Sequence, residues 1–246
     1  MRTRLLKAVF FLAGLVVALG IGFVIWANDV PEPTQVAQDA LVSSPDMTVR
    51  SDEWVRFEPT EPASVGLIIY PGGKVSAPSY APVARAIADQ GYLVVIPSVP
   101  LNLAFFGSGI ANDVIDTYPD VSTWCVAGHS LGGTAAALYV EANPDQVACL
   151  GLWASYPAGN TDLSDNSLTV SVVYGTEDGL STVEDVEGTR ALLPDDTVWV
   201  PIEGGNHAQF GAYGAQSGDG VATISAEEQI RITVNATVDM LEAVMP

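Results

Sequence analysis

Residues 124–133 read WCVAGHSLGG, an apolar run that leads into the pentapeptide G-x-S-x-G. The pentapeptide lies between a predicted strand at Trp124–Ala127 and a predicted helix at Gly132–Ala142. A serine on such a sharp strand-to-helix turn needs small neighbours, and the two glycines of the motif supply them. The pattern therefore predicts that Ser130 is a nucleophile, exposed at the carboxyl edge of a sheet.

A serine hydroxyl is a weak nucleophile unless a base accepts its proton, and the chain has only two histidines. His129 adjoins the serine within the turn, so its ring is expected to point away from the hydroxyl and to serve in packing. His207 is then the sole plausible general base. It follows the predicted strand Val198–Ile202, which fits the chain order Ser, Asp, His of this kind of triad.

The third group of a triad is a carboxylate that fixes the tautomer of the histidine and stabilises the imidazolium. The predicted strand Leu168–Tyr174 runs into Gly-Thr-Glu-Asp-Gly, and we assign this role to Asp178. Glu177 is the neighbour to exclude and is expected to face solvent. Asp162 and Asp165 lie in an earlier loop and are less well placed.

Acyl transfer also needs backbone N–H groups that bind the oxyanion of the tetrahedral intermediate. One donor is expected at Leu131, the residue after the nucleophile. The other is expected in the loop Tyr70–Lys74, which follows the predicted strand Val65–Tyr70. Gly73 N–H is our choice, with Lys74 N–H as the alternative. A plain Pro-Gly turn without a catalytic role is the rival interpretation of this loop.

Strand-like and helix-like runs alternate along the chain, which indicates an α/β fold with a mostly parallel sheet and helices on both faces. The loop Ala154–Ser167 is too short for a helical lid, so no large lid domain is expected. Predicted strands are 48–50, 54–57, 65–70, 92–96, 124–127, 147–153, 168–174 and 198–202, and predicted helices are 82–90, 110–117, 132–142, 183–193 and 225–244.

The loop Pro100–Gly109 is rich in apolar residues. Its Leu101, Leu103, Phe105 and Phe106 are candidates for the wall of a pocket that takes an acyl or alkyl group. Packing in the core is an equally good interpretation of these side chains.

The chain resembles the alpha/beta-hydrolase superfamily and, within it, the alpha/beta-hydrolase-5 domain group, relatives of dienelactone hydrolases. The resemblance implies an alpha/beta-hydrolase fold and a serine hydrolase that acts on ester-type bonds. Dienelactone hydrolases use a cysteine nucleophile where this chain has Ser130, so their substrate is not carried over. The oxyanion loop also departs from the H-G-G-G of many esterases. The segments that carry the resemblance are 70–74, 128–133, 153–157, 174–179 and 203–210.

Composition excludes several classes of function. Nine Lys and Arg against 29 Asp and Glu give a net charge of −20, which argues against binding to nucleic acid. The two Cys and two His lack metal-ligand spacing, so neither a metal nor a cofactor is expected. Cys125 and Cys149 lie on strands that the fold makes neighbours. Both a disulfide and free thiols are compatible with this position, and we predict free thiols.

Residues 8–27 carry no charged side chain, and as a helix they would match the hydrocarbon core of a bilayer. Basic residues precede this run and acidic residues follow it, which predicts a cytoplasmic N-terminus and an extracytoplasmic remainder. We therefore divide the chain into a transmembrane signal anchor at 1–28, a tether at 29–46 and a hydrolase domain at 47–246. A cleaved signal peptide that releases a secreted protein is the alternative.

Together these patterns predict a membrane-tethered serine hydrolase that cleaves small-molecule carboxylic esters through an acyl-enzyme. Two alternatives remain at this stage. A hydrolase-like fold could serve as a non-catalytic binding module, or the acyl group could pass to an acceptor other than water.

Overall fold

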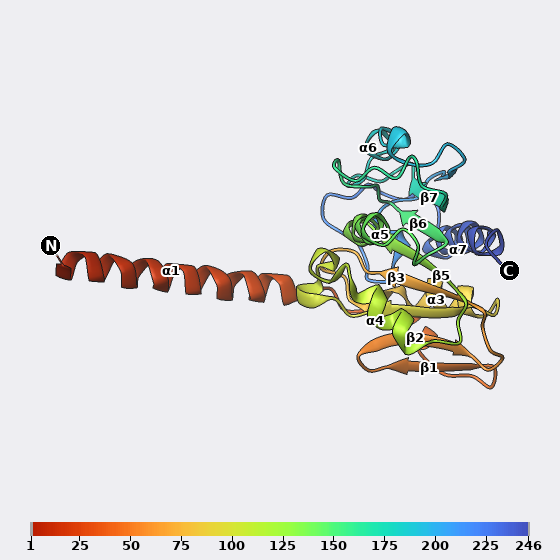
Figure 1. The fold of residues 1–246 in the computed structure, drawn as a ribbon, viewed down its shortest axis with the longest axis horizontal. Helices are drawn as coiled ribbons and strands as arrows, with labels where there is room; N and C mark the ends of the chain where they lie inside the picture. The colour runs from red at the N-terminus through yellow and green to blue at the C-terminus, as the bar shows by residue number, and fades with distance from the viewer. Residues whose placement is uncertain (1, 246) are drawn as a thin grey trace.

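The computed structural model describes residues 2–245 and contains one eight-stranded sheet in the order β1-β2-β4-β3-β5-β6-β7-β8 (Figure 1). The strands from β4 to β8 along this order run parallel, whereas β2 is antiparallel to both β1 and β4. The strands are β1 (Met47–Ser51), β2 (Trp54–Pro59), β3 (Val65–Tyr70), β4 (Leu93–Pro97), β5 (Thr123–His129), β6 (Cys149–Trp153), β7 (Thr169–Gly175) and β8 (Val198–Ile202).

Helices cover both faces of the sheet. Helices α3 and α7 pack on the face that carries Leu67 and Ile69 of β3, and α4, α5 and α6 pack on the face that carries Ile68 and Tyr70. The mostly parallel α/β architecture predicted from the sequence is thus confirmed. The helices are α1 (Arg2–Asn28), α2 (Gln35–Ala40), α3 (Ala81–Ala88), α4 (Ile110–Thr117), α5 (Leu131–Ala142), α6 (Val183–Glu187) and α7 (Ala226–Glu242), and the 3₁₀ turns are η1 (Ala77–Tyr80), η2 (Pro100–Asn102), η3 (Ala104–Gly107), η4 (Arg190–Leu192) and η5 (Ala208–Phe210).

The helix predicted at 183–193 is shorter than expected. It begins with a capping box in which the Thr182 hydroxyl and the Asp185 carboxylate satisfy each other's backbone N–H groups. It ends after Glu187, where Gly188 forms the C-cap, and a separate 3₁₀ turn follows. Glycine has a low helix propensity, so Gly188 ends the helix earlier than the predicted range.

Helix α1 projects from the domain as one long rod (Figure 1). Its segment Val9–Asn28 is the one helix in the described part of the chain that is long and apolar enough to cross a membrane, with a mean hydropathy of 2.6. Its large apolar side chains are exposed along most of this length. Such a surface suits a membrane anchor or a signal sequence.

The segment predicted as a tether, 29–46, is folded against the domain from Thr34 onward. Thr34 N–H donates to the carbonyl of Ala212 at 2.8 Å, and Ala37 of α2 is fully buried. The guanidinium of Arg85 in α3 donates to the carbonyl of Val42 at 2.6 Å. The division into anchor, tether and domain stays a prediction, but residues 34–46 of the predicted tether contact the domain instead of forming a flexible linker.

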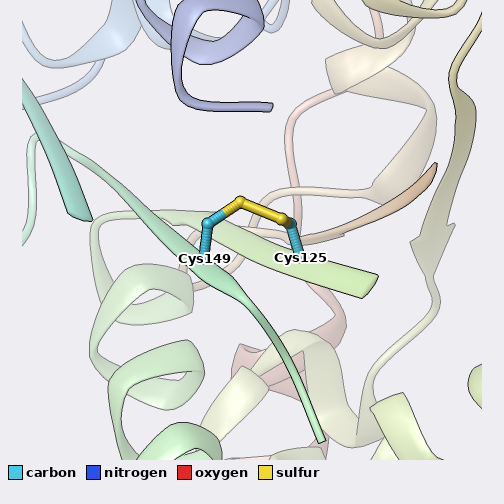
Figure 2. Close-up of a disulfide and its surroundings, with 2 residues drawn as sticks. All are labelled: Cys125 and Cys149. Atoms are coloured by element: carbon cyan, nitrogen blue, oxygen red, sulfur yellow. A yellow bond between two sulfur atoms is a disulfide. The ribbon is translucent and has the colours of Figure 1, made fainter. Parts of the chain in front are cut away.

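Cys125 and Cys149 form a disulfide, so the prediction of free thiols is wrong (Figure 2). The two residues are direct partners in the register of β5 and β6, with Cα atoms 4.7 Å apart. That separation lies within the range of disulfides. The sequence indicates that the two strands are neighbours, but it does not determine that the cysteines face each other on the same side of the sheet.

We expect the double variant Cys125→Ala/Cys149→Ala to fold with a lower free energy of unfolding. The bond closes a loop with a sequence separation of 24 residues, and loop-closure entropy predicts a loss of about 3.5 kcal/mol. Urea unfolding of both proteins measures the difference. An intact mass of the non-reduced wild type that matches two free thiols would contradict the disulfide itself.

Candidate active site

The turn between β5 and α5 holds Ser130 at φ 53° and ψ −125°, a conformation that few non-glycine residues adopt. Such strain persists only where surrounding contacts hold it. Ser130 N–H donates to the carbonyl of Trp153 at 2.9 Å, and the Ser155 hydroxyl donates to the carbonyl of Ser130 at 2.6 Å. The end of the neighbouring strand β6 therefore fixes the turn that presents this serine.

Both glycines of the pentapeptide are required by close backbone packing. A Cβ at Gly128 would lie 2.3 Å from the carbonyl carbon of Gly132. A Cβ at Gly132 would lie 2.2 Å from the carbonyl oxygen of Tyr70 at the end of β3. No side chain fits at such distances, so the glycines allow α5 to approach the sheet edge where Ser130 sits.

His207 and Asp178 form a buried pair beside this edge. His207 Nδ1 lies 2.8 Å from Asp178 Oδ2, and the two side chains are 2% and 0% exposed. The other carboxylate oxygen, Oδ1, accepts the N–H groups of Leu180 at 2.8 Å and Ser181 at 2.7 Å. Because an ionised carboxylate only accepts, Nδ1 carries the proton of a neutral His207 ring and Nε2 is free to act as a base.

The other candidate carboxylates lie elsewhere. Glu177, Asp162 and Asp165 are all exposed, whereas Asp178 is buried and is the one bonded to the histidine. This geometry favours Asp178 as the acid of a triad. Ser130 Oγ has no hydrogen-bond partner within residues 2–245, so the contact from the serine to His207 stays a prediction.

A second carboxylate, Asp219, was missed by the sequence analysis. Its oxygens accept the backbone N–H groups of His207 at 3.1 Å and Ala208 at 2.8 Å. It also accepts the N–H of Gly179 at 3.3 Å, beside the acid Asp178. Asp219 thus ties the histidine loop to the acid loop. Its Gly-Asp-Gly context signals a turn, but nothing local to it signals these partners.

The two proposed oxyanion donors lie on loops that touch each other. A Cβ built on Gly73 would lie 3.2 Å from Leu131 Cδ2, which puts the loop after β3 against the start of α5. Neither Gly73 N–H nor Leu131 N–H has a hydrogen-bond partner among residues 2–245. The alternative donor is already used, because Lys74 N–H donates to the carbonyl of Asn102 at 2.7 Å. The geometry therefore favours Gly73 over Lys74.

Residues 66–231 match the sequence model of the alpha/beta hydrolase family. The chain belongs to the alpha/beta hydrolase family. This match confirms the resemblance inferred from the serine turn and the loops around it, and membership indicates hydrolase activity. No curated protein matches the chain.

Solved structures share the fold at low sequence identity. A predicted CIB-like hydrolase from Thermoplasma acidophilum is 16% identical with a TM-score of 0.60, and the match covers 78% of this chain and 99% of that one. An alpha/beta hydrolase enzyme from the metagenome of lagoon sediments at Mar Chica, Morocco, is 18% identical with a TM-score of 0.53, covering 66% and 89%. At such identities the likeness shows the fold alone.

In this hydrolase the hydroxyl of Tyr80 connects the serine turn with the oxyanion loop. The Tyr80 oxygen accepts the N–H of Gly72 at 2.9 Å and lies 2.8 Å from His129 Nδ1. Tyr80 is fully buried at the end of η1. One side chain thus holds the residue before Gly73 and the residue before Ser130, a link that no local sequence pattern indicated.

His129 is a packing residue, as the sequence analysis preferred. It is 1% exposed, and its ring centroid lies 4.5 Å from that of His207 and 5.6 Å from that of Phe210. Burial, followed by the nearby His207, lowers the pKa of His129 well below its usual value. A neutral His129 adds no positive charge next to His207, the predicted base.

The apolar loop Pro100–Gly109 divides into two parts. Leu103 approaches the oxyanion loop, with its Cδ2 3.7 Å from a Cβ built on Gly73, and Ala104 is fully buried. Phe105 and Phe106 are 59% and 56% exposed, so neither belongs to the core.

We expect Tyr80→Phe to lower kcat with little change in KM, because the oxyanion loop loses the bond that positions it. The loss should be roughly 10- to 100-fold, the range expected from small displacements of catalytic groups. The variant should still fold, since an unpaired buried polar group costs about 1–3 kcal/mol.

Tyr118→Phe is the matched control, because it removes a 2.7 Å bond to Glu58 far from the serine turn. It should leave kcat nearly unchanged. Equal loss of kcat in the two variants would mean that Tyr80 has no special role in positioning.

Proposed function

We propose that the protein is a membrane-anchored serine hydrolase that cleaves carboxylic esters through an acyl-enzyme. Ser130 is the nucleophile, His207 the general base and Asp178 the carboxylate that orients it. The backbone N–H groups of Gly73 and Leu131 bind the oxyanion.

The 2.8 Å bond between His207 Nδ1 and Asp178 Oδ2 carries this proposal. It joins two loops that follow different strands, β7 and β8, at the same sheet edge as the strained Ser130. A histidine with one nitrogen tied to a buried carboxylate presents the other nitrogen as a base. A structural ion pair would not need to sit beside a strained serine.

Acylation follows from these roles. Ser130 Oγ attacks the carbonyl carbon of the ester, and its proton passes to His207 Nε2. The carbonyl oxygen gains negative charge and accepts hydrogen bonds from Gly73 and Leu131, while Asp178 stabilises the imidazolium. The C–O bond to the alcohol then breaks, and the alcohol oxygen takes the proton from Nε2.

Deacylation repeats these steps with water. His207 Nε2 takes a proton from the water, whose oxygen attacks the acyl carbon, and the acid leaves as Ser130 regains its proton. An alcohol in place of water would give a new ester instead. Product analysis with added alcohols separates acyl transfer from hydrolysis.

The membrane part of the proposal rests on α1. Its apolar segment matches the thickness of a bilayer, Arg2, Arg4 and Lys7 precede it, and Asp29 and Glu32 follow it. The positive-inside rule then places the N-terminus in the cytoplasm and the catalytic domain outside. A disulfide between Cys125 and Cys149 suits such an oxidising compartment.

A fluorophosphonate probe is expected to label the wild type and not Ser130→Ala. Ser130→Ala and His207→Ala should each lower kcat on a p-nitrophenyl ester by roughly 10⁴-fold or more, and Asp178→Asn by about 10⁴-fold. Glu177→Gln is the control for the acid and should be mild, since its side chain is exposed. A non-catalytic binding module would show neither labelling nor turnover.

The anchor predicts that the full-length protein stays with membranes through washes with high salt and alkaline carbonate. Such washes release proteins that are held by charge but not those that span the bilayer. Immunoblots of the pellet and the medium make the measurement. A shortened protein in the medium would favour the cleaved signal instead.

A further inference from the structure

The last turn of α1 is docked on the loops beside the candidate site. Ala27 is fully buried, whereas the large apolar side chains before it are exposed. Asn102 Nδ2 of η2 donates to the carbonyl of Ala27 at 3.2 Å. Figure 1 shows α1 leaving the domain beside the yellow-green segment that contains η2, the turn that follows β4. The helix therefore ends at the carboxyl edge of the sheet, where Ser130 lies.

A second contact ties the helix to the oxyanion loop itself. The ammonium of Lys74 lies 4.7 Å from the ring centroid of Trp26. Trp and Lys are both typical of the interface between the hydrocarbon core and water, and a cation over an indole face is a favourable pair. Lys74 directly follows Gly73, so a bilayer-spanning α1 would bring this loop close to the membrane interface.

Two exposed aromatic side chains lie beside the same helix end. Among residues 2–245, Phe105 and Phe106 are the only exposed Phe, Tyr or Trp outside α1, at 59% and 56%. They belong to η3, which packs against η2, the turn that holds Ala27. Exposure of two neighbouring aromatic side chains to water is unfavourable, and exposed apolar patches mark binding surfaces.

The charge of these loops fits a lipid surface. The chain has 29 Asp and Glu, yet from Pro62 to Asn112 the only one is Asp89. Asp89 follows α3 and precedes β4, at the opposite edge of the sheet from Ser130. The two loops that contact the end of α1, after β3 and after β4, are therefore free of carboxylates in a strongly acidic protein. Asp29 and Glu32, just beyond the helix, disfavour anionic headgroups and leave neutral or zwitterionic lipids as the better surface.

We propose that the face formed by Gly72–Val75 and Pro100–Gly107 lies on the bilayer surface, with Phe105 and Phe106 inserted in its interface. The site around Ser130 then faces the lipid leaflet rather than bulk water. Its substrate is an uncharged or zwitterionic ester with a long chain that partitions into the membrane. This substrate class rests on the proposed esterase function, whereas the placement of the face does not.

Depth in the bilayer tests the placement directly. The two native cysteines form the disulfide, so a cysteine introduced at Phe105 is the only free thiol. Full-length Phe105→Cys carries a nitrobenzoxadiazole label in phosphatidylcholine vesicles that contain nitroxide-labelled phosphatidylcholine. Val198→Cys is the matched control, because Val198 is 56% exposed at the start of β8, on the opposite edge of the sheet.

We expect strong quenching and a blue-shifted emission at position 105 and neither at position 198. Quenching at both positions, or no quenching at position 105, would overturn the placement. This outcome is independent of any enzymatic activity.

Turnover tests the substrate class. For each protein, the rate on p-nitrophenyl palmitate held in phosphatidylcholine vesicles is divided by its own rate on soluble p-nitrophenyl butyrate, which corrects for any effect on the acyl pocket. In the double variant Phe105→Ser/Phe106→Ser this ratio should fall at least about ten-fold, because burial of two Phe side chains favours the productive orientation. Val198→Ser should match the wild type on both esters.

The outcomes separate the two proposals. A wild type that turns over neither ester would refute the esterase function and leave the depth result standing. Equal ratios for the wild type and the double variant would overturn delivery of the ester from the leaflet, even though ester hydrolysis itself had been demonstrated.

Discussion

Parallel pairing of β5 with β3 on one side and β6 on the other is the constraint on which the candidate site depends. It brings the carboxyl ends of three strands to one edge, so that Tyr70, His129 and Trp153 finish side by side. The oxyanion loop leaves from β3 and the serine turn from β5. The carbonyl that anchors Ser130 comes from the end of β6. The same register sets Cys125 opposite Cys149, which ties the central strands together below the site.

Strain at the serine and rigidity around it belong together. A residue at positive φ relaxes unless surrounding contacts hold it, and close packing and hydrogen bonds surround Ser130. The glycines of the motif are packed against backbone atoms, Tyr80 bridges two loops, and Asp219 bridges two more. The groups proposed to react are thus held by side chains that take no part in the reaction.

The sequence predicted the elements of the fold well because their signals are local. Apolar runs, the glycines of the serine turn and a count of two histidines were enough to select Ser130 and His207. Asp178 was selected by its place after a strand, and its bond to His207 gives that assignment a geometric reason. Asp219 and Tyr80 could not be found in this way, because the partners through which they join the loops lie 8 to 49 residues away along the chain. The disulfide was missed for a related reason, since it depends on the register between strands and not on either strand alone.

The docked end of α1 restricts movement of the hydrolase domain relative to the helix. Only residues 29–33 separate Asn28 from Thr34, which is itself bonded to Ala212. Ala27 is buried, and Asn102 donates a hydrogen bond to the Ala27 carbonyl, so the end of the helix is fixed to the domain. A membrane-spanning helix tilts more as the hydrocarbon core becomes thinner. If α1 spans the bilayer as proposed, that tilt would turn the docked domain with the helix, so the thickness of the membrane would set the angle at which the loops around Ser130 face the lipid surface.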